Sequence, residues 1–270
     1  MRGILNKIFH EIRWPVLFFS VGLGLIMALL TTLLPKILSD IDKVFERLPF
    51  IKPIITALLG IDPGDEFTAQ MIQAFLWVHP SVLAVTWAHE VMYCTRLPAG
   101  EIDRGTVDFL LGLPVSRWTL YVGETIGWAV SGLVMLSSGW LGHFLASGVL
   151  QPDMRPGWLP TLFVMLNLFA VYCAVGGFSF LVSTLSNHRT RAIGVVFAVL
   201  LSSFLLNFLA QFWDPAKNVS FLSVMEYYRP AIIIQSGQFP FCDVGILLGI
   251  GGCCWFIGGL VFRCRSICTV

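Results

Sequence analysis

The stretch WPVLFFSVGLGLIMALLTTLL, residues 14–34, is apolar except for Ser20, Thr31 and Thr32. A helix that spans the hydrocarbon of a bilayer needs about 20 mostly apolar residues, so this stretch predicts a membrane span. The whole chain of 270 residues agrees with that prediction, because 56% of it is hydrophobic and only 12% is charged. Soluble domains carry about 25% charged residues. Lipid must therefore be part of the solvent around this chain.

Five further apolar stretches are long enough to span a membrane. Their approximate boundaries are 75–93, 122–150, 158–185, 193–212 and 244–262. The stretch at 75–93 is the least uniform, because His79, His89 and Glu90 interrupt it. No soluble domain and no internal repeat is evident. The sequence predicts an all-α integral membrane protein with six transmembrane helices, in a single transmembrane domain over residues 1–270.

Lysine and arginine are unevenly divided between the two sides of the predicted bundle, and they favour the cytoplasmic side of a membrane. The segments on the side of the N-terminus are shorter in total and hold ten of the 17 basic residues, which are Arg2, Lys7, Arg13, Arg96, Arg104, Arg117, Arg189, Arg191, Arg263 and Arg265. This pattern predicts that both termini are cytoplasmic. The first apolar stretch is too long for a signal peptide and lacks a small-residue cleavage site, so we expect it to be retained.

Two connections on the outer side are predicted to hold helices that do not span. In residues 35–74, Ile37, Ile41 and Val44 recur at helical spacing with charges between them, which predicts an amphipathic helix on the outer membrane surface after the first span. The connection at 213–243 contains SVMEYYRPAIIIQSG. Its apolar middle is too short to span, so we expect an interfacial or re-entrant helix there.

Between the second and third predicted spans lies AGEIDRGTVDFLLGLPVSRW, residues 99–118. Charged residues cluster at its start and leucines follow, after which Pro114 breaks the helix and Ser116 can cap the next one. Such an amphipathic element can lie at the membrane surface or dock into a groove on a partner protein. An ordinary interfacial linker is an equal alternative from these residues alone.

Residues 99–118 also resemble the signature of type-2 ATP-binding-cassette (ABC) transporter permeases. In that family an acidic-Arg-Gly-Thr stretch leads through Leu-rich residues to Pro-Val-Ser-Arg. The stretches GGFSFLVSTLSNHRTRAIG (residues 176–194) and LVFRCRSI (residues 260–267) are similar to later parts of the same family. The resemblance touches most of the chain. It departs at Cys264 and Ser266, where relatives are often more charged.

The resemblance implies a six-span permease domain that pairs with a second permease copy or a paralogue. Each copy would bind a separate ABC-type ATPase subunit, and ATP would drive export of an unidentified substrate. We therefore expect an integral protein of a bacterial or archaeal plasma membrane. The family mechanism makes residues 101–117 the cytoplasmic coupling helix and turn.

Within that coupling element the resemblance implies three roles. Polar contacts to the ATPase would come from Glu101, Asp103 and Arg104. A close helix approach or a cap would come from Gly105 and Thr106. The turn into the third span would be fixed by Pro114, Val115, Ser116 and Arg117.

The sequence gives an independent reason to expect the ATPase in another polypeptide. A Walker A loop needs Gly directly before its Lys, so that backbone amides cradle the phosphates. The five lysines follow Asn6, Pro35, Asp42, Ile51 and Ala216, so none follows Gly. We expect a non-catalytic subunit that binds no cofactor itself, with ATP and magnesium held by the partner ATPase.

Three polar residues near the cytoplasmic ends of the predicted spans are candidates for the translocation path or a gate: His89, Glu90 and Glu124. Charged groups in a span cost at least about 2.5 kcal/mol at mid-membrane, so they usually face protein or water. The structural alternative pairs Glu90 with Arg96, Arg117 or a helix neighbour, or leaves it snorkelling at the interface. For Glu124 the structural alternative is a contact with Arg117 or the ATPase.

Two other classes of membrane protein remain as alternatives. An ion-coupled secondary transporter would need acids at mid-membrane and usually internal repeats. An intramembrane hydrolase would need a nucleophile and a base, and no convincing pair is evident. The seven cysteines include no CxxC pair with histidines at ligand spacing, so we expect no metal site. No basic patch with interleaved aromatics indicates nucleic-acid binding.

Overall fold

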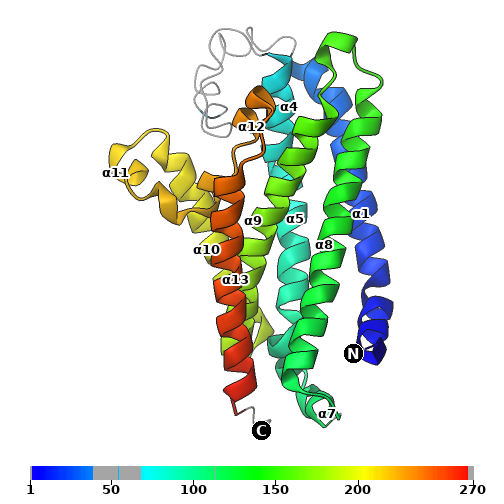
Figure 1. Cartoon of the computed structure of the whole chain (residues 1–270), viewed down its shortest axis with the longest axis vertical. Coiled ribbons are helices and arrows are strands. Elements are labelled where there is room, and N and C mark those ends of the chain that lie inside the picture. The colour runs from blue at the N-terminus through cyan, green and yellow to red at the C-terminus, as the bar shows by residue number, and fades with distance from the viewer. Residues whose placement is uncertain (1, 39–53, 55–67, 113, 267–270) are drawn as a thin grey trace.

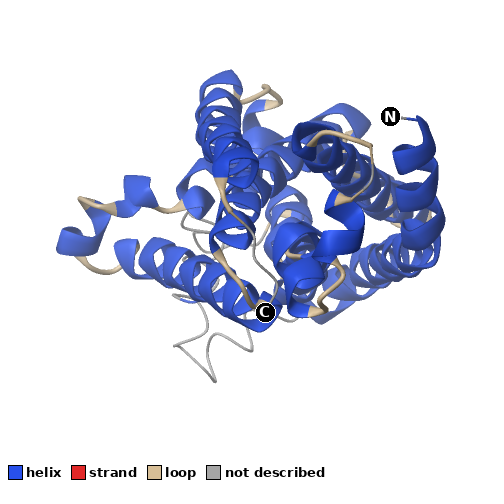
Figure 2. Cartoon of the chain, turned by 90° about the horizontal axis from the view of Figure 1, so that it is seen from below, coloured by secondary structure: helices blue, strands red, loops and turns tan. Residues whose placement is uncertain are grey.

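The computed structural model describes residues 2–38, 54, 68–112 and 114–266. Within those residues the chain is helical with short loops and contains no strand (Figure 2). The long helices are α1 (Arg2–Leu38), α4 (Ala69–Val78), α5 (Pro80–Cys94), α8 (Arg117–Ser147), α9 (Trp158–Leu185), α10 (Arg189–Ala210) and α13 (Phe241–Cys264). The short ones are η1 (Arg96–Gly100), α6 (Glu101–Asp103), α7 (Val107–Leu111), η2 (Pro152–Met154), α11 (Asp214–Lys217), η3 (Ser220–Leu222), η4 (Val224–Tyr227) and α12 (Pro230–Ser236).

Six helical segments of this structure are long and apolar enough to cross a membrane: α1, the consecutive α4 and α5, α8, α9, α10 and α13. This confirms the prediction of an all-helical integral membrane protein with six spans. The second span starts earlier than predicted, because α4 begins at Ala69. A break at His79 divides it, and Pro80 opens α5 at the first helical position, where its missing N–H costs nothing.

The start of α1 and the end of α13 lie at one end of the bundle, together with α7 (Figure 1). We call this end the terminal face. The other end holds the start of α4, the loop between α8 and α9, and α12, and we call it the opposite face. With 37 residues, α1 is about 55 Å long, well above the roughly 30 Å thickness of bilayer hydrocarbon. This helix therefore extends beyond the hydrocarbon.

Two pairs of spans, α1 with α8 and α9 with α13, approach each other closely through glycines. A Cβ added at Gly142 of α8 would overlap the carbonyl group of Gly24 on α1. A Cβ added at Gly251 of α13 would lie 2.6 Å from the carbonyl oxygen of Cys173 on α9. Small residues of this kind let transmembrane backbones approach and gain packing contacts. The neighbouring Gly252 differs, because a Cβ there would meet nothing within 4 Å.

The span α10 is the least enclosed, since 17% of its most apolar stretch is buried, against 67% for the central helix α9. An open apolar groove of about 530 Å³ separates α10 from α5. Leu83, Trp87 and Phe197 are among the side chains that line it, and Arg189 lies at its end near the terminal face. The following helix α11 projects sideways from the bundle (Figure 1).

The two non-spanning helices that we predicted have different outcomes. The amphipathic helix expected after the first span lies mostly outside the described residues, and α1 itself continues to Leu38. The connection before the last span contains several short helices, of which α12 packs against α4. Just before α12, the hydroxyl of Tyr228 donates to the carbonyl oxygen of Trp77 at 3.1 Å.

Candidate functional site at the terminal face

The segment that joins α5 to α8, residues 95–117, lies at the terminal face, and we call it the joining segment. After η1, its first α-helix, α6, ends in a Schellman cap. The N–H of Gly105 donates to the carbonyl of Ile102, and the N–H of Thr106 donates to that of Glu101, both at 3.0 Å. These two bonds require a left-handed residue between them, which is why glycine stands at a φ of 69°. Among the described residues, no atom lies within 4 Å of a Cβ built at Gly105, so within this chain the glycine serves the cap.

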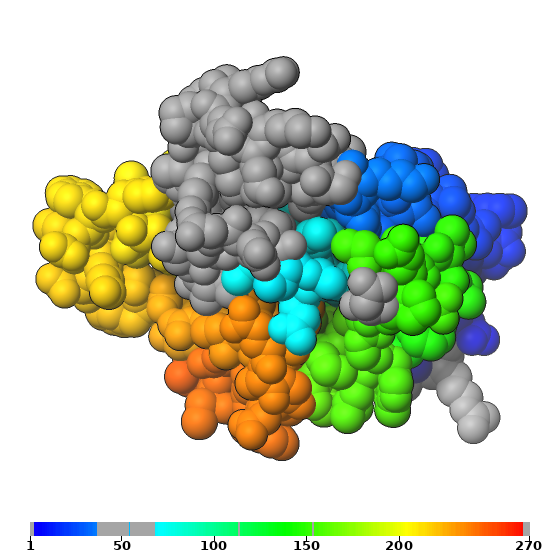
Figure 3. All heavy atoms as spheres, turned by 90° about the horizontal axis from the view of Figure 1, so that it is seen from above, coloured from blue at the N-terminus to red at the C-terminus, as the bar shows by residue number. Residues whose placement is uncertain are grey.

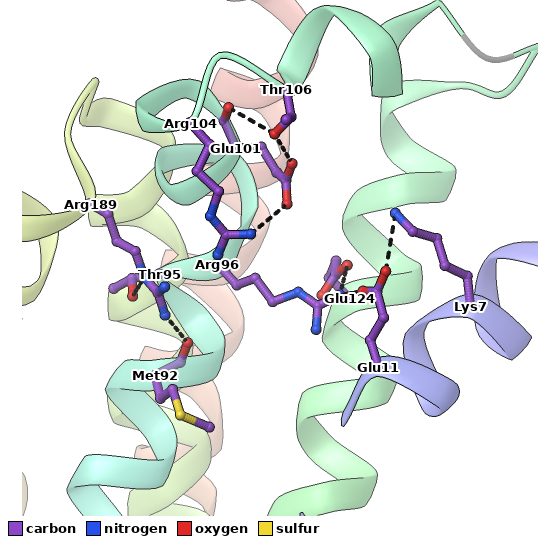
Figure 4. A network of polar contacts seen from close by, with 10 residues as sticks. All are labelled: Lys7, Glu11, Met92, Thr95, Arg96, Glu101, Arg104, Thr106, Glu124 and Arg189. Atoms are coloured by element: carbon purple, nitrogen blue, oxygen red, sulfur yellow. Dashed lines mark hydrogen bonds and ion pairs between the residues drawn. The ribbon is translucent and has the colours of Figure 1, made fainter. Parts of the chain in front are cut away.

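Glu101 is held within the joining segment. Its carboxylate accepts a hydrogen bond from the Thr106 hydroxyl and lies 3.9 Å from the Arg104 guanidinium (Figure 4). The side chain of Glu101 is only 15% exposed, whereas that of Arg104 is 55% exposed. Arg104 is thus more available to a partner protein than Glu101 is.

The second helix of the joining segment, α7, presents an aromatic ring to the surroundings. Val107 and Leu110 are buried and attach the helix to the bundle, while Phe109 is 78% exposed. With 100° of rotation per residue, Phe109 lies about 200° from Val107 and 100° from Leu110. The sequence analysis missed Phe109, although this helical angle could have shown that it faces away from the packed side. Leu113 lies outside the described residues.

The turn into α8 is capped and anchored. The N–H of Thr119 donates to Ser116 Oγ at 3.0 Å, which confirms the predicted cap. Pro114 and Val115 lie in the turn itself. The guanidinium of Arg117 donates to the carbonyl oxygens of Phe262, at 3.2 Å, and of Arg265. The joining segment is therefore fixed to the end of α13.

Two contacts connect the joining segment to the start of α10. The His188 Nδ1 and Asp103 Oδ1 atoms are 3.0 Å apart. The Arg189 guanidinium donates to the Met92 carbonyl at 2.8 Å and to Thr95 Oγ1 at 3.3 Å (Figure 4). The sequence analysis did not identify His188 as a partner, because the contact joins residues far apart in the chain.

A cluster of opposite charges ties three spans together beside the joining segment. Arg96, just after α5, lies 3.5 Å from Glu124 of α8 and also pairs with Glu11 of α1 (Figure 4). Lys7 adds a contact to Glu11 at 3.7 Å. Arg117, one of the two partners that we considered for Glu124, donates to α13 instead, and Arg96 takes its place in this chain. We call these four residues the charge clamp.

A family model described as ABC-2 family transporter protein matches residues 91–233, just over half of the chain. The chain belongs to this family. The matched region begins at the end of α5, contains the whole joining segment and ends within α12. No curated protein and no solved structure matches the chain. As an ABC-2 permease, it is an integral membrane component of an ABC transporter, in a family that pairs with an ABC ATPase subunit and is normally non-catalytic.

The other candidate residues of the ABC-2 permease lie inside the bundle. His89 and Glu90 are both fully buried. His89 Nδ1 lies 3.0 Å from the hydroxyl of Tyr172, whose ring stacks on Trp128 with a centroid distance of 4.9 Å. In the part of the chain that the structure describes, neither carboxylate oxygen of Glu90 has a hydrogen-bond partner.

Glu90 of the permease is also without the cation that we considered for it. The guanidinium of Arg96 belongs to the charge clamp, and that of Arg117 binds backbone carbonyls of α13. A buried acid in a span usually faces a partner, a cavity or an ion pathway. Glu90 faces none of the partners that we considered, so a role in a translocation path would require a conformation in which its surroundings are different. Among the described residues, no three His, Cys, Asp or Glu side chains form a group that could hold a metal ion.

Proposed function

We propose that this chain is the non-catalytic permease of an ATP-driven exporter, in which two permeases pair and each binds a separate ATPase subunit on the terminal face. The terminal face would be cytoplasmic, and ATP and magnesium would be held by the partner. The observation that carries the proposal is α7, which presents the exposed ring of Phe109 at the terminal face, where α1 starts and α13 ends (Figure 1). An exposed aromatic of this kind is suited to fill an apolar groove on a partner.

The connections of the joining segment support its role as the coupling element. Through Arg96 it is tied to α1 and α8, through Asp103 and His188 to α10, and through Arg117 to α13. A displacement of α7 by the ATPase would therefore move several spans instead of being absorbed in a loose loop.

The residues of the coupling element would have three different roles: contact with the ATPase, positioning of the helices, and capping. Phe109 would insert into the ATPase, and the exposed side chains of Asp103 and Arg104 would make polar contacts around it. Glu101 and Thr106 would hold α6 and α7 at a fixed angle through their hydrogen bond. The remaining positions, Gly105 and Pro114 to Arg117, would set the cap and the turn.

His89, Glu90 and Glu124 enter this proposal as candidate gate residues. The groove between α5 and α10 is lined on the α5 side by Trp87, Ala88 and Val91, among others. Glu90 precedes Val91, so about 100° of rotation of α5 would turn it toward the groove. We infer that the present conformation is closed and that ATP-driven movement of the joining segment would rotate α5. Glu124 would guide that movement through the charge clamp.

The test is co-purification of the permease with a co-expressed ABC-type ATPase subunit from the same genome. We expect Phe109→Ala to weaken association about 10- to 100-fold, because a buried Phe side chain contributes about 1.5–3 kcal/mol. Phe241→Ala is the matched control, since Phe241 is 77% exposed but begins α13 at the opposite face. Equal binding by both variants would remove the coupling role from α7.

The orientation is tested separately. A cysteine at position 109 or 241 would be labelled in intact cells with a membrane-impermeant maleimide, in a background where Cys242, Cys253 and Cys264 are serine because they are exposed. We expect labelling at 241 and protection at 109. The reverse result would place the joining segment on the side away from ATP and exclude the proposed mechanism.

A further inference from the structure

A polar pocket of about 420 Å³ lies where α10 ends toward the opposite face. Its walls come from the end of α10, from α11 and from η4. The side chains that matter for its chemistry are Asn207, Gln211, Asp214, Lys217, Glu226 and Arg229. None of them belongs to the joining segment or to the charge clamp.

The wall opposite α10 is held in place by several hydrogen bonds. The Ser223 hydroxyl donates to the Ser203 carbonyl at 2.8 Å, and the N–H of Val224 donates to the Ser203 hydroxyl at 3.0 Å. Inside the pocket, the Glu226 carboxylate accepts from the Asn207 amide at 3.2 Å and pairs with Arg229. The pocket is thus organised before any ligand binds.

Three of its groups have binding capacity left. Among the described residues, neither the Lys217 ammonium nor the Asp214 carboxylate has a hydrogen bond or an ion pair to another side chain. Arg229 donates two hydrogen bonds to Glu226, through Nε and one terminal nitrogen, so other N–H groups of its five remain available. The pocket therefore offers two cationic groups and one carboxylate to a ligand.

The pocket lies at the level expected for lipid headgroups. The span α10 has 22 residues, or about 33 Å, which matches the bilayer hydrocarbon, and the pocket begins at its last turn. Phe212 and Trp213 follow at once and are more than half exposed, as is typical of interfacial aromatic belts. This region stands out sideways from the rest of the molecule (the yellow segment in Figure 3), so lipid can reach it laterally.

We propose that this pocket binds the headgroup of a zwitterionic aminophospholipid, phosphatidylethanolamine in chemical class, from the leaflet at the opposite face. The formal charges of Asp214, Lys217, Glu226 and Arg229 sum to zero. The lipid phosphate binds Lys217 and Arg229, and the primary ammonium binds Asp214 beside the ring of Trp213. The glycerol headgroup of phosphatidylglycerol offers Asp214 only neutral hydroxyl groups and no cation, which is why the aminophospholipid is preferred.

The test uses the full-length permease in nanodiscs that contain equal amounts of phosphatidylethanolamine and phosphatidylglycerol. Lipids that remain bound after extraction are counted by native mass spectrometry. We expect at least about a tenfold preference for phosphatidylethanolamine in the wild type, the effect of one favourable ionic contact. Asp214→Asn should reduce that preference to near unity, because it removes the partner of the ammonium group. Lys217→Gln should lower the retention of both lipids, because both carry the phosphate, and should leave the preference for phosphatidylethanolamine in place.

Asp243→Asn, at the start of α13 on the same face, is the matched control and should leave the preference unchanged. Because the side chains of Asp214 and Lys217 have no protein partner in the described structure, their replacement should not unfold the permease. Equal retention of both lipids by the wild type would overturn the proposal, as would an unchanged preference in Asp214→Asn or unchanged total retention in Lys217→Gln. Displacement of the bound lipid by soluble glycerophosphoethanolamine at micromolar concentration would also overturn it, since the ligand would then be a free solute.

Discussion

The spans of this ABC-2 permease divide into two closely packed pairs and one loosely packed pair. In the pairs α1–α8 and α9–α13, glycines bring backbones so close that no Cβ fits between them. Between α5 and α10, an apolar groove of about 530 Å³ keeps the helices apart. The difference indicates where movement costs least free energy. No closely packed glycine pair holds α5 to α10, and their link at the terminal face is the side chain of Arg189, which donates to the Met92 carbonyl. Helix α5 ends at the joining segment, and α10 begins beside it.

The largest expected effect tests the close packing of α9 and α13. Gly251→Leu should lower the free energy of unfolding by about 3 kcal/mol or more, because its side chain would collide with the Cys173 backbone. Gly252→Leu, one residue away and facing open space, should change it by no more than about 0.5 kcal/mol. Thermal unfolding of the detergent-purified variants measures both, and equal midpoints would show that this helix pair is not closely packed.

A second prediction concerns the charge clamp that connects the loose pair to the close ones. Arg96→Gln should cost about 2–3 kcal/mol, because it leaves the mostly buried Glu124 without its cation. The double variant Arg96→Gln with Glu124→Gln should recover at least about half of that loss. Arg263→Gln, exposed at the end of α13, is the control. If the double variant is no more stable than Arg96→Gln alone, the two side chains are not coupled.

A third, smaller effect on stability is expected in the groove. Ala84→Phe should change the free energy of unfolding by less than about 1 kcal/mol, since the groove has room for the ring. The same variant should reduce permease-dependent stimulation of the partner ATPase, because the ring obstructs the movement of α5 toward α10. Val134→Phe, exposed on α8 outside the groove, should reduce neither quantity. A loss of stability as large as that of Gly251→Leu would contradict the loose packing of α5 and α10.

The smallest expected change in stability follows from the isolation of Glu90. Glu90→Gln should leave the unfolding free energy within about 1 kcal/mol of the wild type or raise it, because no partner contact is lost. Glu124→Gln is the comparison and should destabilise, since it breaks a pair. Chemical denaturation separates the two. If Glu90→Gln destabilises as much as Glu124→Gln, Glu90 has a partner and the gate hypothesis loses its basis.

The sequence predicts the six spans because hydropathy over about 20 residues depends only on local composition. It also predicts the Ser116 cap, since a cap is a contact between residues three apart. It fails for Glu124, which pairs with Arg96 and not with Arg117. Both arginines are near the same end of the bundle, and only the directions of α5 and α8 decide between them.

The same reasoning explains which glycines could be assigned. The abundance of glycine in α13 predicts close packing, but Gly251 and Gly252 differ completely in what surrounds them. Which of the two glycines faces α9 depends on the rotation of α13 about its axis. The sequence does not indicate this rotation, because apolar residues lie on all sides of the helix. For Phe109 the sequence is sufficient. The positions of Val107 and Leu110 on α7 fix the packed side of that helix, and the angle of 100° per residue places Phe109 on the other side.

The unbroken length of α1 has a mechanical consequence. This helix lies along α8 over much of its course, and the charge clamp attaches its first turns to the joining segment. The two helices together form a stiff unit that is attached to the joining segment at one surface of the bilayer. By the rise of about 1.5 Å per residue, a tilt imposed near Glu11 would displace the far end of α1 at the opposite face, reduced by any bending at Pro15 and Pro35 inside the helix. A force that a partner exerts at the terminal face would thus be transmitted to the opposite face through one helix, α1.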